Sequence, residues 1–408
     1  MLPAATSGPR PGVRETVALL AMLMAINSMA IDAMIPALPA IGRDLGVASA
    51  NSRQLVVIAY MAGFGFGHLG WGPLADRFGR KTTLGIGVGL YAGFALLCGV
   101  STSFEMLIAG RLAMGMSAAV TRVLATAMVR DLFEGEAMAR VMSLVSMTFM
   151  VVPMIAPTLG QAILLVAPWR AIFVVFAGFA GVMWWWSFIR LPETLHEDFR
   201  RSLDPRDVAA AIRMALTDRL SLGYTLALTA LTGALVAYIS SIQQIVFDVF
   251  HRPAMIGLIF AAIAAPMVLS SFTNSRIIER FGLRRVGHGG LIVYVVVASI
   301  NLVTALTGTQ TIASFIVLMG LTMASFSLCG ANFSTLAMTN MAEIAGTASS
   351  VQGLVSTVFG AAIGFAIGQA FDGTVIPFLV GLVGCGAAAL ALTAITERGR
   401  LLRPLNAL

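Results

Sequence analysis

The sequence contains little charge and few cysteines for its length. Only 11% of its 408 residues are charged, whereas charged residues make up about 25% of a typical soluble domain. The three cysteines, Cys98, Cys329 and Cys385, lie in apolar stretches without CxxC spacing. They are therefore expected to be small buried side chains and not a disulfide framework or a thiolate site. The four histidines are scattered, so we expect no bound metal.

Motifs typical of several enzyme classes are also missing. The sequence has no Walker A, GxSxG or HExxH pattern, so it gives no indication of ATP-driven pumping, serine hydrolysis or zinc proteolysis. We therefore expect no enzymatic activity and no cofactor. The 26 Lys and Arg outnumber the 19 Asp and Glu. These basic residues gather in short loops, which indicates membrane topology and not nucleic-acid binding.

Hydrophobic residues make up 58% of the chain, and long apolar stretches recur along all of it. Each stretch has about 20 residues, which is enough for one helix to cross a bilayer. The sequence therefore predicts an all-α membrane protein with twelve transmembrane helices. The predicted spans are residues 14–39, 52–75, 83–102, 104–129, 139–166, 170–190, 219–247, 255–277, 288–307, 311–336, 346–371 and 376–396.

The chain contains an internal repeat. Residues 76–81 (DRFGRK) follow the second predicted span, and residues 279–284 (ERFGLR) follow the eighth. Acid, arginine, phenylalanine, glycine and a final base match in register, which predicts two pseudo-symmetric six-helix halves. Transporters built from such repeats bind substrates near the membrane midplane, between their halves. The predicted segments are an N-terminal tail (1–13), the first half (14–190), a polar linker (191–218), the second half (219–396) and a C-terminal tail (397–408).

Both tails and the linker are expected on the cytoplasmic side. Cytoplasmic loops gather Lys and Arg, and on this layout only Arg43, Arg53, Arg170 and Arg252 lie in loops on the opposite side. An even number of spans places the two termini on the same side of the membrane. We expect a monomeric, multi-pass protein surrounded by lipid in the inner (plasma) membrane of a bacterium.

Of the charged residues within the predicted spans, Asp32, Arg111 and Arg122 lie away from the span ends, and Glu105 lies near one. A charge inside a bilayer costs at least a few kcal/mol, so such residues usually face a bundle interior or a water-filled path. Asp32 and Arg111 lie at matching depths, roughly 10 Å from the outer ends of their spans at ~1.5 Å per residue. Glu105 lies at the outer end of its span, where we expect it to be solvated.

Asp32 and Arg111 are the predicted proton-coupling residues. Burial disfavours an ionised carboxylate, whereas a neighbouring arginine favours it. Asp32 could therefore gain and lose a proton as its access to water and its distance from Arg111 change. The alternative is a static buried pair that only fixes the fold. Arg122 lies 11 positions after Arg111, so the two arginines share one helix face.

Residues 70–84 (GWGPLADRFGRKTTL) combine a glycine-rich helix end with a basic turn. They resemble the signature between the second and third helices of the major facilitator superfamily. In that family this cluster latches the cytoplasmic side of the transporter in its outward-open state, so the resemblance implies the same fold and a conformational gate here. A basic turn that serves only topology is the alternative. The implied gate residues are Gly72, Asp76, Arg77, Gly79, Arg80, Lys81, Arg130 and Asp131.

Further segments resemble the Bcr/CflA-type drug/proton antiporters of that superfamily. Residues 31–39 (IDAMIPALP) are close to the family pattern IDMYLPALP, and residues 129–133 (VRDLF) and 192–195 (PETL) match its VRDLF and PETL. The antiporter signature of the fifth helix, roughly GPxxGG, reads APTLGQ at 156–161. Pro157 and Gly160 are thus retained and both flanking glycines are changed. Met114 and Thr126 stand where the family has Gln and a second Arg.

The resemblance implies a secondary active transporter that exports a small amphipathic, drug-like compound in exchange for protons. A proton-coupled importer of a small metabolite is the alternative on the same fold, because the changed fifth-helix signature indicates a different pocket. An integral-membrane enzyme or receptor is a further alternative, although no cluster of catalytic polar residues supports it. Polar and flexible side chains within spans are the candidates for substrate contact, and interhelical hydrogen bonding or packing is their alternative role. They are Asn27, Met34, Tyr60, Arg122, Tyr238, Gln243, Asn332 and Gln352.

Overall fold

The computed structural model describes residues 12–47, 49, 51–133, 135–195, 205–341 and 344–402. Every regular element in these residues is a helix, as the long apolar stretches predict. Most of the predicted N-terminal tail (1–11), the middle of the predicted linker (196–204) and the end of the C-terminal tail (403–408) lie outside the described residues.

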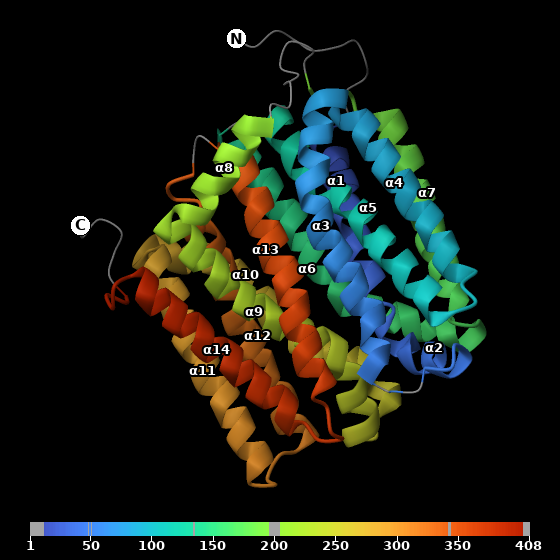
Figure 1. The fold of residues 1–408 in the computed structure, drawn as a ribbon, viewed down its shortest axis with the longest axis vertical. Coiled ribbons are helices and arrows are strands. Elements are labelled where there is room, and N and C mark those ends of the chain that lie inside the picture. Colours follow the sequence, from blue (N-terminus) through green and yellow to red (C-terminus); the bar gives the residue numbers. More distant parts are fainter. Residues whose placement is uncertain are drawn as a thin grey trace. The chain divides into compact units, whose positions relative to one another are not determined.

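The first half of the chain contains six spanning segments, two of which are interrupted. The first segment breaks after Asp32, and the second begins with a short 3-10 turn. Their elements, shown in Figure 1, are α1 (Val13–Asp32), 3-10 helix η1 (Ile35–Ala37), α2 (Leu38–Asp44), 3-10 helix η2 (Asn51–Gln54), α3 (Leu55–Phe78), α4 (Arg80–Gly99), α5 (Phe104–Leu132), α6 (Gly135–Val166) and α7 (Arg170–Arg190).

The second half has the same number of spanning segments, preceded by one short helix. Its elements are α8 (Pro205–Thr217), α9 (Arg219–Gln244), π-helix η4 (Ile245–Val249), 3-10 helix η5 (Pro253–Met255), α10 (Ile256–Phe281), α11 (Leu283–Leu306), α12 (Ile312–Ala337), α13 (Ala345–Gln369) and α14 (Ile376–Thr396). Within the described residues, eleven helical segments are long and apolar enough to cross a membrane. The 32-residue helix α6, whose apolar part is Val151–Val166, completes the twelve.

Helix α8 is a feature that the sequence analysis did not predict, because it lies in the segment assigned as a polar linker. Its apolar side chains occupy one face, as in an amphipathic surface helix. Ala215 on that face is 3% exposed and packs with Met341, Ala348 and Val351. The linker is therefore partly helical and is anchored on the residues around the start of α13.

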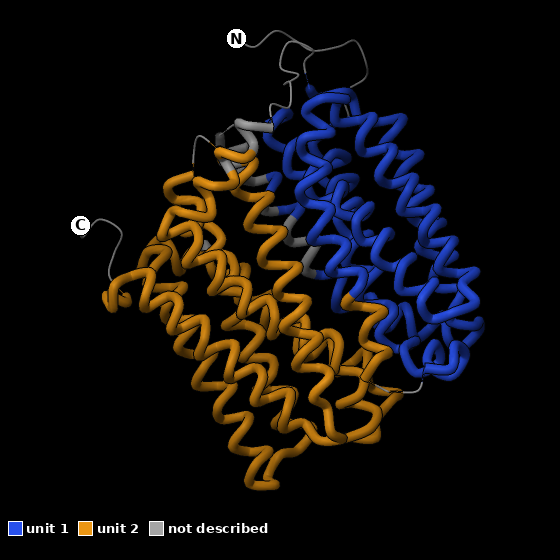
Figure 2. Tube along the Cα trace, in the orientation of Figure 1, with its two compact units in different colours: residues 1–47, 59–208 blue, residues 48–58, 209–408 orange. Residues whose placement is uncertain are grey.

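The chain forms two compact units. Unit 1 contains residues 1–47 and 59–208, and unit 2 contains residues 48–58 and 209–408 (Figure 2). In unit 1, α1 packs against α6, and α4 packs against α5 and α7. In unit 2, the corresponding helices pair in the same way, since α9 packs against α13, and α11 against α12 and α14. The packing thus follows the internal repeat.

The two copies of the repeated motif have the same backbone conformation. Gly79 lies between α3 and α4 with φ 94° and ψ 154°, and Gly282 lies between α10 and α11 with φ 80° and ψ 156°. Residues with a Cβ atom rarely adopt positive φ values, so glycine suits both turns. Each turn lets a new helix begin immediately after the previous one ends.

Candidate functional site

Asp32 is the last residue of α1, directly before the break in the first spanning segment. Pro36 and Pro39 follow it at the first turns of η1 and α2. Proline lacks a backbone N–H and cannot continue a helix from the preceding turn, so these residues interrupt the helix here. The Ala33 N–H still bonds to the Met29 carbonyl, and the later carbonyl groups of the last turn of α1 have no partners within the helix. Asp32 therefore lies next to polar backbone inside an apolar segment.

Arg111 on α5 binds this broken end of α1. Its Nη2 donates a hydrogen bond of 2.9 Å to the carbonyl oxygen of Ala30, and its side chain is fully buried. A cation at a helix C-terminus interacts favourably with the helix dipole and with the unpaired carbonyl groups. Arg111 thus fixes the turn of α1 that carries Asp32.

Aromatic and polar side chains hold the Arg111 guanidinium from α3 and α7. The guanidinium carbon lies 4.4 Å from the ring centre of Tyr60 and 6.0 Å from that of Phe173. The Tyr60 hydroxyl donates a 3.0 Å hydrogen bond to Asn27 Oδ1 on α1. Asn27 and Tyr60 were candidates for substrate contact. They are buried, and the hydrogen bond between them joins α1 and α3.

Close helix packing sets the positions of these residues. A Cβ atom on Gly115 of α5 would lie 2.0 Å from the carbonyl oxygen of Tyr60, and one on Gly160 of α6 would lie 2.0 Å from that of Ala33. Only glycine permits such approaches of one backbone to another. Gly160 therefore lets α6 touch the residue after Asp32, and the buried Pro157 lies one turn earlier on the same helix.

The Asp32 carboxyl is 4% exposed, and its Oδ1 atom has no hydrogen-bond partner among the described residues. Within the same part of the chain, no ion pair joins it to Arg111, which binds the Ala30 carbonyl instead. Arg111 thus contacts the helix turn that contains both Ala30 and Asp32. A direct contact between the carboxyl and the guanidinium is not part of this arrangement.

The remaining unit 1 candidates differ in environment. Met34 is fully buried in the bend after Asp32. Arg122 is exposed although Arg111, on the same face of α5, is buried. The difference arises because the end of α1 and the Tyr60 ring cover only the level of Arg111. Glu105 is exposed at the start of α5, where the sequence predicts it to be solvated.

The unit 2 candidates are buried, and three of them contact neighbouring helices. Asn332 Nδ2 donates to Asn274 Oδ1 at 3.1 Å, and Gln352 Oε1 accepts from the Ser334 hydroxyl at 3.1 Å. The Tyr238 ring stacks against Phe260 at 5.5 Å. Gln243 is 2% exposed near the end of α9. Interhelical bonding therefore describes Asn332 and Gln352 in this conformation.

Side-chain amides form a hydrogen-bonded cluster in unit 2. Gln54 Nε2 donates to Gln244 Oε1 at 2.5 Å, and Gln244 Nε2 donates to Asn51 Oδ1 at 2.8 Å. Asn51 also donates to the carbonyl oxygen of Gln369 at 3.1 Å, and Gln369 Nε2 returns a bond of 3.0 Å to the Asn51 carbonyl. The cluster ties the start of the second spanning segment to α9 and α13. Asn51 and Gln54 lie in a loop-like polar stretch, so apolar periodicity gave no signal for them.

The predicted gate residues form an ion-pair network around the turn between α3 and α4. Arg80 Nη1 lies 2.6 Å from Asp76 Oδ1, and Arg80 Nε lies 3.2 Å from Asp131 Oδ2. The Thr194 hydroxyl donates to the same Asp131 oxygen at 2.9 Å. The structure thus brings together Asp76, Arg80 and Asp131.

The other gate candidates surround this network. Arg77 is exposed and lies over the Phe78 ring at 5.3 Å, and Lys81 lies over the Phe188 ring at 5.0 Å. Arg130 is exposed at the end of α5. A Cβ atom on Gly72 would meet only Val123, at 3.9 Å, so close packing does not explain this glycine.

Glu193 completes the network and was not identified as a site residue from the sequence. Its carboxylate accepts hydrogen bonds from the backbone N–H groups of Arg80 at 2.7 Å and Lys81 at 3.1 Å. The first N–H groups of a helix lack partners within the helix and attract negative charge. Glu193 therefore caps α4, and the PETL pattern was the signal that could have pointed to it.

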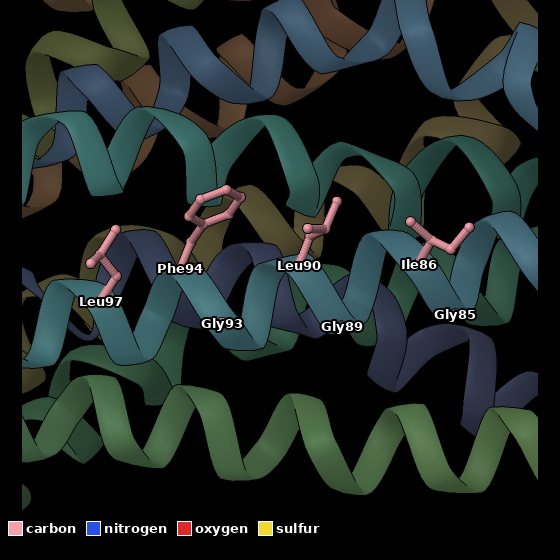
Figure 3. A pocket seen from close by; sticks show the side chains of 7 residues that line it. All are labelled: Gly85, Ile86, Gly89, Leu90, Gly93, Phe94 and Leu97. Atoms are coloured by element: carbon pink, nitrogen blue, oxygen red, sulfur yellow. The ribbon is translucent and has the colours of Figure 1, made fainter.

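One hollow in unit 1 lies away from this site and has no polar lining side chain. It has a volume of about 490 Å³ along α4, where Gly85, Gly89 and Gly93 leave space beside Ile86 and Leu90 (Figure 3). Ile86 is 54% exposed, as expected for a lipid-facing residue. The hollow therefore differs chemically from the site around Asp32. Among the described residues, no group of three or more His, Cys, Asp or Glu side chains could hold a metal ion.

Comparison with known proteins agrees with this architecture. The family described as the Major Facilitator Superfamily matches residues 20–365. An uncharacterized MFS-type transporter, YdgK, of Bacillus subtilis is 30% identical over 86% of this chain and 87% of its own. A bicyclomycin resistance protein homolog of Haemophilus influenzae is 27% identical, covering 93% and 95% of the two chains.

Two further similarities extend over nearly the whole chain. Multidrug resistance protein MdtL of Klebsiella pneumoniae is 25% identical, covering 93% of this chain and 95% of its own. The crystal structure of the human organic anion transporter MFSD10 (TETRAN) superimposes with a TM-score of 0.66 at 19% identity, covering 97% of this chain and 100% of that one. At this identity the structural similarity supports the fold alone.

Proposed function

Because the chain belongs to the Major Facilitator Superfamily, we propose that it exports a small amphipathic compound across the bacterial inner membrane in exchange for protons. Membership makes it a membrane transporter, and two of its relatives are named for bicyclomycin and multidrug resistance. The proposed partners are the transported compound, protons and the lipid bilayer. The proposed working unit is the monomer, with both termini in the cytoplasm.

The buried carboxyl of Asp32 is the observation that carries the proposal. It ends a broken helix, and its Oδ1 has no hydrogen-bond partner among the described side chains and backbone groups. An ionised carboxylate without full hydrogen bonding is costly inside a protein, and a bound proton removes that cost. A rearrangement that opens Asp32 to water would favour release of the proton. Asp32 can therefore couple protonation to conformation.

Arg111 is proposed as a positioning residue in this cycle. Its guanidinium holds the Ala30 carbonyl and stacks on Tyr60, so it fixes the end of α1 while leaving the Asp32 oxygen uncommitted. Gly160 allows α6 to support the same end of α1. Discontinuous helices with uncommitted polar groups form the binding sites of many secondary transporters. Asn27, Met34, Tyr60, Arg122, Tyr238, Gln243, Asn332 and Gln352 remain proposed substrate contacts for conformations in which they become accessible.

The network around Asp76, Arg80 and Asp131 is proposed as the gate. Its ion pairs and the Glu193 cap fix the turn between α3 and α4. Alternating access requires such contacts to differ in strength between the two conformations of the transporter. A change at Asp76 should then alter the rate of exchange and leave the fold intact.

A drug-susceptibility panel tests this function directly. The protein would be expressed in a bacterial host that lacks its own efflux pumps, with the Asp32→Asn variant at matched membrane levels as control. We expect resistance to rise at least several-fold for one or more amphipathic compounds, and an uncoupler to abolish the increase in their efflux. A panel without any increase over the variant would contradict the proposal.

Proton-coupled import of a small metabolite is the second candidate. It is favoured by Ala156 and Gln161, which replace the glycines flanking Pro157 and Gly160 in the antiporter signature. The direction of transport separates the candidates. In vesicles with an imposed pH gradient, an antiporter moves its substrate against the direction of proton flow, and a symporter moves it with the protons.

A further inference from the structure

A second buried cluster of ionisable side chains lies in unit 2, where the C-terminal segment returns to the start of α11. His288 on α11 is fully buried, and its Nε2 lies 3.0 Å from the Tyr224 hydroxyl of α9. That hydroxyl donates to Glu397 Oε1 at 2.5 Å, and Arg284 Nε lies 3.1 Å from the same oxygen. The transport mechanism above uses none of these residues.

His288 also holds the last described residue of the chain. The backbone N–H of Leu402 donates a 3.1 Å hydrogen bond to His288 Nδ1, and the Leu402 carbonyl accepts from Arg285 Nε at 3.1 Å. We call the segment 397–402, bound in this way to His288, Arg285, Tyr224 and Arg284, the C-terminal clasp.

The hydrogen-bond partners assign the protonation state of His288. Nδ1 accepts a hydrogen bond from a backbone N–H, so it carries no proton. Tyr224 gives its only proton to Glu397, so Nε2 must donate to the Tyr224 oxygen. Both ring nitrogens are therefore used by a neutral imidazole with its proton on Nε2.

We propose that the C-terminal clasp is a pH-dependent contact that opens when His288 binds a second proton. A proton on Nδ1 would face the Leu402 N–H, placing two donors opposite each other, and the hydrogen bond would be lost. Histidine can take up this second proton, but burial disfavours the charged ring, so a lower pH is needed than for an exposed histidine. In the topology proposed above, the clasp lies on the cytoplasmic face.

The charged groups around His288 have opposing effects on its protonation. From its own helix, Arg284 and Arg285 disfavour a second positive charge, whereas Glu397 after α14 favours it and is already paired with Arg284. From α9 comes the Tyr224 hydroxyl, and from α12 come the Phe333 ring and the Cys329 thiol, which is bonded to the Gly287 carbonyl at 3.5 Å. The backbone N–H of Leu402 is the one group whose contact is lost outright on protonation.

The internal repeat relates part of the clasp to the first half of the chain. In the first half, Glu193 follows the sixth spanning helix and caps the start of α4 through backbone N–H groups. Glu397 follows the twelfth and binds the start of α11. At the position of His288 the first half has Gly85, 203 residues earlier. An acidic anchor for the helix start thus occurs in both halves, whereas the histidine occurs only in the second.

A spin label on the exposed Arg400 position tests the clasp in the full-length protein. The three native cysteines are buried, so an Arg400→Cys variant directs the nitroxide to the segment. We expect an immobile spectrum at pH 8 that becomes mobile by pH 4. A label at the exposed Arg213→Cys position of α8 should show no such change, and His288→Gln should remove the pH dependence at position 400.

Three results would overturn the proposal. The first is an unchanged Arg400→Cys spectrum between the two pH values, and the second is the same change at Arg213→Cys. The third is an undiminished change in His288→Gln or in His288→Asn, the substitute if the glutamine variant does not fold. Persistence of the change in Glu397→Gln would further support histidine as the titrating group, and its loss there alone would contradict that assignment. If neither histidine variant is recovered folded, the test rests on the Arg400→Cys and Arg213→Cys spectra at the two pH values.

Discussion

Arg111 donates a 2.9 Å hydrogen bond to the carbonyl oxygen of Ala30, in the helix turn that ends at Asp32. This contact brings Arg111 to the helix turn of Asp32 without an ion pair between the two side chains. The arginine donates to the Ala30 carbonyl at the end of α1. The Oδ1 atom of Asp32 has no hydrogen-bond partner among the described residues. Protonation of Asp32 can then change without breaking the contact that positions it.

Replacement of Arg111 should destabilise the protein. Arg111→Met removes a charge-assisted hydrogen bond, typically worth about 1.5–3 kcal/mol, and the stacking on Tyr60. Arg111→Lys keeps the charge but not the planar stacking, so its stability should lie between those of wild type and Arg111→Met. Thermal unfolding in detergent measures the effect. Arg122→Met, on the same helix but exposed, is the matched control and should unfold close to wild type; an equal loss in both would argue against the capping role.

Gly160→Ala should disturb the site through α1. The added methyl group would come within 2.0 Å of the Ala33 carbonyl oxygen, so α6 and the end of α1 must move apart. We expect lower stability and impaired proton-driven transport, measured by thermal unfolding and by uptake into vesicles. Gly178→Ala on α7, where a Cβ atom meets nothing within 4 Å, is the control. A Gly160→Ala protein with normal transport would show that this contact does not position Asp32.

Asp76→Asn should slow transport with little effect on stability. Its ion pair with Arg80 involves a side chain that is 40% exposed, and such pairs contribute about 0.2–1 kcal/mol. The substitution should change the rate of exchange between conformations, because the conformation that contains the Asp76–Arg80 ion pair loses this contact. Transport rates in proteoliposomes measure it, with Glu279→Gln at the equivalent position of the second half as a comparison. Wild-type rates for Asp76→Asn would mean that the network serves only structure.

The topology predicts where reporters fused to the chain will be active. Fusions after Asp372 should report a periplasmic position, and fusions at Asp204 and Leu408 a cytoplasmic one, because Lys and Arg gather on the cytoplasmic side. Paired reporters that are active on opposite sides of the membrane provide the control. A periplasmic signal at Asp204 would reverse the whole layout and move the C-terminal clasp to the outer face.

The helical architecture could be predicted from the sequence because each span has its own apolar signal. The repeated DRFGRK and ERFGLR turns likewise predicted two matching halves, and Gly79 and Gly282 share one backbone conformation. Depth along a helix was also predictable, since a fixed rise per residue brought Arg111 and the end of α1 to one level. Helix α8 was missed because its polar composition hid an amphipathic pattern.

Contacts that depend on side-chain geometry were harder to predict from the sequence. Sequence spacing placed Asp32 near Arg111 but could not reveal that the arginine would take the Ala30 carbonyl, because that depends on where prolines break α1. The Glu193 cap and the amide cluster around Gln54 join residues that are more than a hundred positions apart. Neither lies on a periodic apolar face, so the apolar pattern of the chain does not predict these contacts.

Asp32→Asn tests the central claim most directly. The substitution mimics the protonated acid at nearly constant volume, so the protein should insert and fold as wild type. In proteoliposomes with an imposed pH gradient, and with a compound identified in the susceptibility panel, the variant should fail to concentrate the substrate while still binding it with weaker pH dependence. Concentrative transport by Asp32→Asn with the wild-type pH dependence would contradict the account, because Asp32 would then not carry the proton.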